Sequence, residues 1–158
     1  MGERVGNAET EKAMMNLYAH YGVKKFEDGL FWLKEVADYI SYATGVVIPP
    51  NKAIVGEYAF AHESGIHTHG VLSDPLTYEP YLPKLVGNVR KLTVGEQSGR
   101  AIIKHKIEKL TGKEIPPKDP RLDALLKDIK DVYASGERKS SLREEEFKEL
   151  VFKAGLAK

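Results

Sequence analysis

The stretch HESGIHTHG, residues 62–70, contains three of the five histidines of the chain, and histidine serves both as a metal ligand and as a proton acceptor near neutral pH. In a helix that turns about 100° per residue, His67 and His69 point about 200° apart, and His62 and His67 about 140° apart. Helical zinc ligands are usually spaced by three or four residues, which brings their nitrogens to one ion. The spacing here therefore disfavours a metal site built from this stretch alone.

A general base requires only one imidazole within hydrogen-bond reach of the substrate. Gly65, two residues before His67, would weaken a helix by about 1 kcal/mol, so its presence indicates a bend or a close approach of another backbone segment. Two interpretations of His67 stay open on this ground: a catalytic base, or a helix residue that bonds a nearby carbonyl group.

Hydrophobic periodicity predicts the elements that position the histidines. A helix is expected over residues 7–20, with Asn7 as its N-cap and Gly22 as its stop. A second helix should run from Asp28 to Gly45, and its many aromatic residues indicate a partner surface. A third helix, over residues 58–72, should carry the histidines and end at the turn of residues 73–75.

The remainder of the chain is predicted to be helical after one short strand at residues 89–94. Ser98 is expected to cap the first of three charged helices. Their apolar rows are Ile102, Ile103, Ile107 and Leu110; Leu122, Leu125, Leu126, Ile129 and Val132; and Phe147, Leu150 and Val151. Without an alternation of strands and helices, the chain cannot form an eight-stranded barrel.

Composition narrows the class of protein. The 158 residues suit one compact domain or two small subdomains, and 42% apolar residues, 30% charged residues and a net charge of +1 are typical of a soluble globular protein. The balanced charge argues against a nucleic-acid partner, including one bound by Lys104, Lys106 and Lys109. The absence of cysteine excludes disulfides and thiolate catalysis, and without an apolar span or signal core we expect a cytoplasmic protein.

Four segments in order resemble one enzyme family. They are GERVGNAE at residues 2–9, AFAHESGIHTHGVLSDPLTYEP at 59–80, VGNVRKL at 86–92 and VGEQSGR at 94–100. Together they resemble the Claisen-type synthases of homocitrate and 2-isopropylmalate, in their C-terminal part, with archaeal homocitrate synthases as the closest likeness.

The resemblance implies a mainly α fold that begins with the last helix of a (β/α)₈ barrel and continues into helical linker subdomains. The implied divisions are residues 1–22 for the end of the barrel, 23–57 for a linker helix and connector, 58–96 for a first subdomain and 97–158 for a second. Relatives hold a divalent metal (zinc, magnesium or manganese) in the barrel, and their subdomains cross a homodimer. The chain is therefore expected to be a small subunit or a C-terminal fragment that needs a barrel-bearing partner and a second copy.

The reaction implied is condensation of acetyl-CoA with a 2-oxo acid, 2-oxoglutarate being favoured, followed by hydrolysis of the thioester. His67 matches the family's general base, and Tyr78 matches a tyrosine of the acetyl-CoA site that could bond the thioester carbonyl or the enolate. Asn7 matches an asparagine near the metal, although N-capping explains the same residue.

Other residues of these segments receive lesser roles. Glu3 and Arg4 are expected to pair at the barrel rim, His62 and Glu63 to support the site, and His69 to lie at its rim or in solvent. The alternatives to a homocitrate-type enzyme are a subunit of a 2-isopropylmalate or citramalate synthase, or a dimerisation or regulatory module without catalysis.

Overall fold

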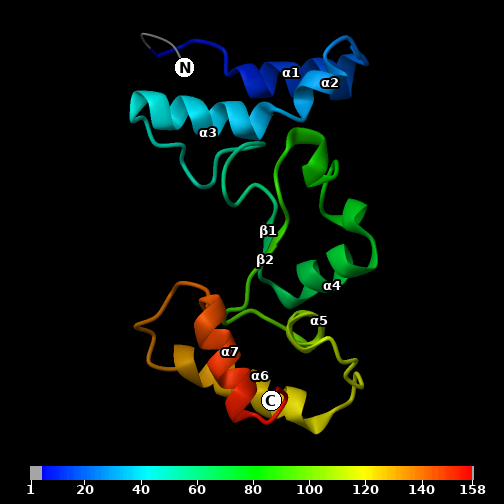
Figure 1. The fold of residues 1–158 in the computed structure, drawn as a ribbon, viewed down its shortest axis with the longest axis vertical. Coiled ribbons are helices and arrows are strands. Elements are labelled where there is room, and N and C mark those ends of the chain that lie inside the picture. The colour runs from blue at the N-terminus through cyan, green and yellow to red at the C-terminus, as the bar shows by residue number, and fades with distance from the viewer. Residues whose placement is uncertain (1–4, 158) are drawn as a thin grey trace. The chain divides into compact units, whose positions relative to one another are not determined.

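The computed structural model describes residues 5–157, and this part of the chain is mainly helical, as predicted (Figure 1). The α-helices are α1 Thr10–Tyr21, α2 Glu27–Leu30, α3 Leu33–Thr44, α4 Gly65–Ser73, α5 Arg100–Thr111, α6 Pro120–Tyr133 and α7 Glu144–Lys153. The 3-10 helices are η1 Pro75–Thr77 and η2 Pro83–Val86, and the strands are β1 Ala61–His62 and β2 Lys91–Leu92. Among residues 5–157, no helix is both long and apolar enough to cross a membrane.

The chain divides into two compact units. Unit 1 comprises residues up to 61 together with 79–91, and unit 2 comprises residues 62–78 together with 92 and beyond. The segment that carries the histidines and Tyr78 therefore folds with the C-terminal helices. The fold of each unit is described separately below.

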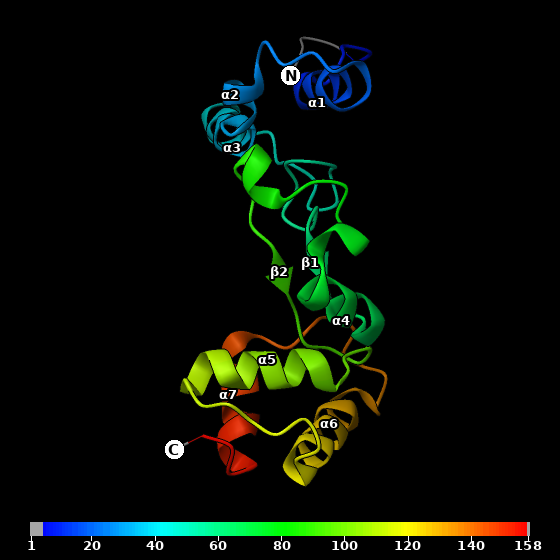
Figure 2. The ribbon, with the colours of Figure 1, turned by 90° about the vertical axis from the view of Figure 1, so that its right-hand side faces the viewer.

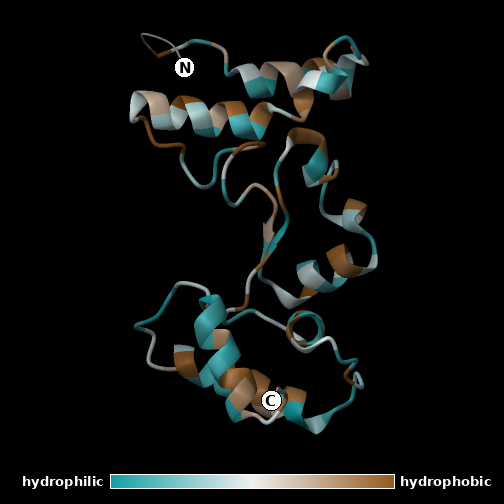
Figure 3. Cartoon of the chain, viewed as in Figure 1, coloured by the Kyte–Doolittle hydropathy of each residue, from teal (hydrophilic) through white to brown (hydrophobic). Residues whose placement is uncertain are grey.

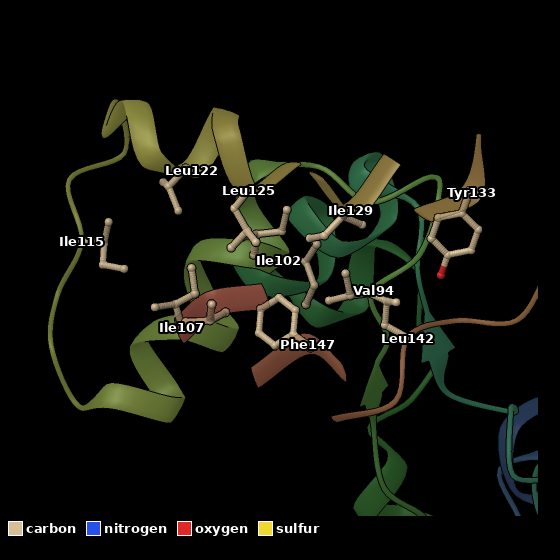
Figure 4. Close-up of a cluster of buried hydrophobic side chains, with 12 residues drawn as sticks. Val94, Ile102, Ile107, Ile115, Leu122, Leu125, Ile129, Tyr133, Leu142 and Phe147 are labelled. Carbon is tan, nitrogen blue, oxygen red and sulfur yellow. The ribbon is translucent and has the colours of Figure 1, made fainter. Parts of the chain in front are cut away.

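Unit 2 is built on the core of its three C-terminal helices. The predicted apolar rows supply buried side chains from α5, α6 and α7, and Figure 4 shows them converging with residues of the connecting segments. This cluster contains Val94, Ile102, Ile103, Ile107, Ile115, Leu122, Leu125, Ile129, Tyr133, Leu142, Phe147 and Val151. Burial of an aliphatic side chain contributes roughly 1.5–3 kcal/mol, so this core accounts for the helical packing of the unit.

The segment between α6 and α7 is fixed by polar contacts. Arg138 donates two hydrogen bonds of 2.8 Å to the carboxylate of Glu146, and the backbone N–H of Arg143 donates a third to the same group. The bonds from Arg138, followed by those from Arg143, hold the pKa of Glu146 well below its ordinary value of 4.5.

Unit 1 has a smaller core, made by Met15, Leu30, Leu33, Ile54, Val55, Phe60 and Val86. One face of α3 stays outside this core. Hydrophobic and hydrophilic residues alternate along that helix (Figure 3), and Val36, Tyr39 and Tyr42 are 50%, 69% and 87% exposed. These three side chains, with the half-exposed Phe31 and Trp32 before them, define the exposed face of α3.

The strand predicted at residues 89–94 is present as β2, and it pairs with β1, which the sequence did not predict. The N–H of Lys91 bonds the carbonyl of Phe60, and the N–H of Thr93 bonds that of His62, both at 3.0 Å. These bonds advance in the same direction along both segments, so the two strands are parallel.

The predicted helix boundaries need correction. The first helix begins at Thr10 with Glu9 at the N-cap position, so Asn7 does not cap it. The second predicted helix is two helices, because the chain turns at Phe31 and Trp32 before α3 begins. Gly45 does end α3, with a φ of 71° that suits glycine.

The histidine helix is also shorter than predicted. Residues 58–64 are not helical, and β1 takes up Ala61 and His62, so α4 starts only at Gly65. Ser98 does not cap α5, whose N-cap is Gly99; instead the Ser98 hydroxyl accepts from the N–H of Gly95 and donates to the carbonyl of Glu63. The predicted pair of Glu3 and Arg4 lies outside the described residues.

Candidate functional site

Helix α4 is held in unit 2 by its first turn. The N–H of Gly65 bonds the carbonyl of Gln97 at 2.9 Å, and a Cβ atom on Gly65 would lie 3.0 Å from the backbone nitrogen of Gly99. This close approach of two backbone segments is one of the two explanations predicted for Gly65. The buried Thr68 donates its hydroxyl to the carbonyl of Ser64 at 3.0 Å, which fixes the inward side of the helix.

The buried side of α4 determines where its histidines point. Thr68 and Val71 face the interior, so His67 and His69, one residue on either side of Thr68, lie on opposite flanks of the helix and both are exposed. Ile66 is 75% exposed on the outer ridge between these flanks. His62 lies on β1 and is not on α4, so the three histidines do not share one face of a helix.

Tyr78 is brought back to His67 by a tight connection. The Asp74 carboxylate accepts from the N–H of Leu76 at 3.0 Å and caps η1, and the N–H of Tyr78 bonds the carbonyl of Pro75. The rings of His67 and Tyr78 then lie with centroids 4.5 Å apart and planes tilted by 49°. The two residues singled out from the sequence therefore form one pair on the surface of unit 2.

Gly70 makes this pairing possible. A Cβ atom at this position would lie 2.6 Å from Cε2 of Tyr78 and 3.0 Å from its Cδ2. Carbon atoms in ordinary contact are about 3.5–4.0 Å apart, so the tyrosine ring occupies the space that a side chain at Gly70 would fill. Tyr78 is still 41% exposed, so part of its surface stays accessible to another molecule.

Glu63 connects the residues before α4 to the segment between α6 and α7. Its carboxylate accepts a hydrogen bond of 2.6 Å from the hydroxyl of Ser141, and a Cβ atom on Gly95 would lie 2.3 Å from its Oε1. The close packing of the Gly95 backbone confines the carboxylate. Glu63 thus holds the chain that leads into the histidine helix.

Two further motif residues have structural roles in unit 1 that the sequence did not reveal. Glu79, which is 2% exposed, receives two hydrogen bonds, of 2.7 and 2.6 Å, from the guanidinium of Arg90. These bonds raise the pKa of Arg90. Asn88 is buried and donates to the carbonyls of Ile54 and Gly56. Such contacts between residues distant in sequence leave no signal in local spacing.

The described residues do not form a metal site by themselves. Among residues 5–157 there is no group of three or more histidine, aspartate or glutamate side chains placed to hold one ion. Asn7 is exposed ahead of α1. Its amide oxygen could serve as one ligand only of an ion whose other ligands lie on other residues.

Comparison with known proteins agrees with these motifs. The family described as "Homocitrate synthase post-HMGL domain-like" matches residues 54–137. A 2-isopropylmalate synthase of Methanocaldococcus jannaschii is 46% identical over 144 residues, covering 87% of this chain and 27% of the relative. The homocitrate synthase AksA of Methanopyrus kandleri is 40% identical over 152 residues, covering 96% and 36%.

A homocitrate synthase of Nostoc is 48% identical over 108 residues, covering 68% of this chain and 28% of the relative. The chain spans between 27% and 36% of the length of these curated relatives. The matched region includes the HESGIH segment, η1 and the Glu79–Arg90 pair. The chain therefore belongs to the homocitrate synthase and 2-isopropylmalate synthase family, of which it represents a C-terminal part.

Proposed function

We propose that this chain supplies the general base and an acetyl-CoA contact of a homocitrate-type synthase. The observation that carries the proposal is the exposed pair of His67 and Tyr78, whose ring centroids are 4.5 Å apart. An imidazole beside a phenol on an accessible surface provides a proton acceptor and a hydrogen-bond donor for one substrate.

In the proposed reaction, one nitrogen of the His67 imidazole takes a proton from the methyl group of acetyl-CoA. The electron pair of that C–H bond moves toward the thioester carbonyl, and the hydroxyl of Tyr78 donates a hydrogen bond to the oxygen on which charge develops. The methylene carbon then bonds the carbonyl carbon of the 2-oxo acid, whose oxygen becomes an alkoxide and is protonated. Water finally cleaves the thioester, which releases CoA as a thiol and leaves a carboxylate.

The 2-oxo acid that we favour is 2-oxoglutarate, which gives homocitrate. A second candidate is the substrate of 2-isopropylmalate synthases, 2-oxoisovalerate, because the relative from Methanocaldococcus jannaschii carries that name and is 46% identical over the matched region. The described part of the chain contributes contacts to acetyl-CoA in either case. The choice of 2-oxo acid would then be made by residues of the barrel.

We further propose that the chain acts in the cytoplasm, in an assembly with a barrel and a second copy of itself. The exposed face of α3 supports this, because contiguous apolar side chains on a protein surface mark interaction sites. In such an assembly residues 1–22 would complete the barrel, and Asn7 would approach its divalent metal. That metal would polarise the 2-oxo acid, and no step assigned here to His67 or Tyr78 depends on it.

The test is to combine the chain with a barrel-bearing partner and to measure CoA release from acetyl-CoA with each 2-oxo acid. His67→Ala should lower the rate by about 10²–10⁴-fold, the usual contribution of a general base. His20→Ala, which removes an exposed histidine of α1, is the matched control and should leave the rate unchanged. An assembled His67→Ala complex with full activity would exclude the proposed role and would favour a module without catalytic function.

A further inference from the structure

The first turn of α4 is held by contacts from outside the helix. Ser64 stands at the N-cap position, but among the described residues its side chain makes no capping hydrogen bond, and Gly65 is the first residue of the helix. A helix start without a side-chain cap is weaker than a capped one, and glycine allows the backbone many other conformations. The place of His67, which lies in this turn, therefore depends on the contacts that hold the chain just before the helix.

Glu63, which immediately precedes the N-cap residue, is fixed at both its backbone and its side chain. Its carbonyl accepts a hydrogen bond of 3.3 Å from the hydroxyl of Ser98, and its carboxylate accepts one of 2.6 Å from the hydroxyl of Ser141. The backbone of Gly95 closes another side, because a Cβ atom there would lie only 2.3 Å from Oε1 of the carboxylate. Of these contacts, the one from Ser141 comes from a segment 78 residues further along the chain.

Ser141 lies on the α6–α7 connection, residues 134–143, which Figure 2 shows in orange. This connection is anchored on both sides of the serine. The N–H of Leu142 donates to the carbonyl of Val94 at 2.7 Å, and the guanidinium of Arg138 donates to the carbonyl of Ser141 at 2.9 Å. The side chain of Leu142 is also buried in the core of unit 2. The connection can therefore hold a carboxylate bonded to it in a defined place.

The bond between Ser141 and Glu63 has more influence on geometry than on stability. Both residues are half-buried, and one hydrogen bond to water-accessible groups adds little to the stability of a fold. Glu63 precedes His67 by four residues, which is about one helical turn, and Gly65 between them does not stiffen the chain. A shift of the glutamate would therefore pass into the first turn of the helix.

The partner of His67 is held at a different point. The ring of Tyr78 packs against Gly70, in the second turn of α4, at the place where a side chain of that residue would lie. A movement confined to the first turn would thus change the present separation of 4.5 Å between the ring centroids of His67 and Tyr78.

We propose that Ser141 is a positioning residue, which acts through Glu63 to set the place of His67 relative to Tyr78. This inference rests on the proposed function for the use that is made of the two rings. Neither the serine nor the glutamate touches a substrate in this role. Their effect on the reaction is through distance, because a displacement of about 1 Å in a catalytic group can lower a rate by about 10²-fold.

The first experiment is NMR of the full chain. Ser141→Ala removes the donor, so the NOEs between the rings of His67 and Tyr78 should weaken. The N–H of Thr68, which bonds the carbonyl of the N-cap residue, should exchange with solvent roughly tenfold faster. Ser141→Thr keeps a hydroxyl and should restore both signals. The matched control is Ser140→Ala, which removes a hydroxyl from the exposed neighbouring residue and should leave both signals unchanged.

The second experiment measures condensation by the assembled enzyme. In Ser141→Ala, kcat and kcat/KM should fall by the same factor, about 10–100-fold, with KM unchanged, because only the geometry of the transition state is disturbed. Glu63→Gln keeps an oxygen that accepts the bond and should keep most of the rate. Glu63→Ala should lose it, and adding Ser141→Ala to that variant should cause no further loss, as expected for two residues that act through one contact.

Thermal unfolding of each variant separates a displaced site from a damaged fold. The melting temperature of Ser141→Ala should stay within about 4 °C of that of the unaltered chain. A much larger fall would assign the bond to the stability of the fold and would overturn the inference. Unchanged NOEs and unchanged exchange of Thr68 in Ser141→Ala, or equal effects in Ser140→Ala, would also overturn it.

The outcome for the proposed function is separate. If His67→Ala inactivates the assembly but Ser141→Ala retains full activity, the positioning role is wrong and the proposed function stands. If Ser141→Ala displaces the two rings in the free chain but the assembly stays fully active with either variant, the proposed function is wrong, and the contact between Ser141 and Glu63 still sets the place of His67.

Discussion

Gly70 offers the sharpest test of the site, because substitution there acts on Tyr78 without removing a functional group. In Gly70→Ala the new methyl group would lie 2.6 Å from Cε2 of Tyr78, whereas carbon atoms in contact are about 3.5–4.0 Å apart. The ring must therefore retreat by about 1 Å. Tyr78 is 41% exposed and free to move outward, so we expect the ring to shift while α4 stays in place.

The stability of the fold and the geometry of the site should respond differently. Alanine is favoured over glycine inside a helix by about 1 kcal/mol, which offsets the lost ring contact, so the free energy of unfolding should change by less than about 1 kcal/mol. A displacement of about 1 Å in a catalytic group can lower a rate by about 10²-fold. Gly70→Ala should therefore keep its stability and lose most of its condensation activity in the assembled enzyme.

The direct measurement is NMR of the chain itself, in which ring protons of His67 and Tyr78 should show mutual NOEs that weaken or vanish in Gly70→Ala. Gly29→Ala is the matched control, because a Cβ atom there would meet only Cε of Met14 at an ordinary 3.8 Å. Persistence of the NOEs and of full activity in Gly70→Ala would refute the placement of Tyr78. A loss of several kcal/mol in stability would refute the claim that only the ring must move.

Three other predictions concern the contacts that support the site. Arg90→Met should lower the free energy of unfolding, measured by urea denaturation, by about 3 kcal/mol, because it leaves the buried carboxylate of Glu79 without its partner. Adding Glu79→Met should recover most of this loss, and a single Arg90→Met variant as stable as the unaltered chain would contradict the pairing. Gly95→Ala should destabilise the chain by about 1 kcal/mol, because the new methyl group displaces the carboxylate of Glu63. In a chain that already carries Glu63→Ala, the same change at Gly95 should cause no such loss. Arg138 lowers the pKa of Glu146, so the stability that this carboxylate contributes is present above its unfolded pKa of 4.5 and is lost as the pH falls below that value. Glu146→Gln should therefore make the free energy of unfolding less dependent on pH below 4.5. An unchanged pH dependence in that range would exclude the effect.

Local patterns predicted the elements whose formation depends on neighbours in the sequence. The apolar rows of α5, α6 and α7 recur at helical spacing, and their buried members Ile102, Leu125 and Phe147 lie in one cluster. Gly45 was recognised as a helix stop because a left-handed C-terminal residue favours glycine. In these cases the sequence signal and the structural cause lie within one or two helical turns.

The features that were missed depend on residues far apart in the sequence. Apolar and aromatic residues at 58–62 predicted a helix, but the carbonyls of Phe60 and His62 bond the second strand, about thirty residues later. Ser98 looked like an N-cap, yet its hydroxyl is used by Gly95 and by the distant Glu63. A single sequence does not show such pairings, so tertiary contacts overrode the local preference.

Burial separates the motif residues that build the fold from those for which we propose contact with a substrate. Glu79, Asn88 and Ser98 are buried, and each is hydrogen-bonded within its own unit, as burial of a polar group requires. His67 and Tyr78 lie in the same motifs but are exposed, and neither contributes to either apolar core. Stability of the fold does not account for an exposed ring pair whose contact requires glycine at position 70. The proposed contact with a substrate would account for this pair, and it would also explain why the proposed base and its proposed hydrogen-bond donor lie at the surface.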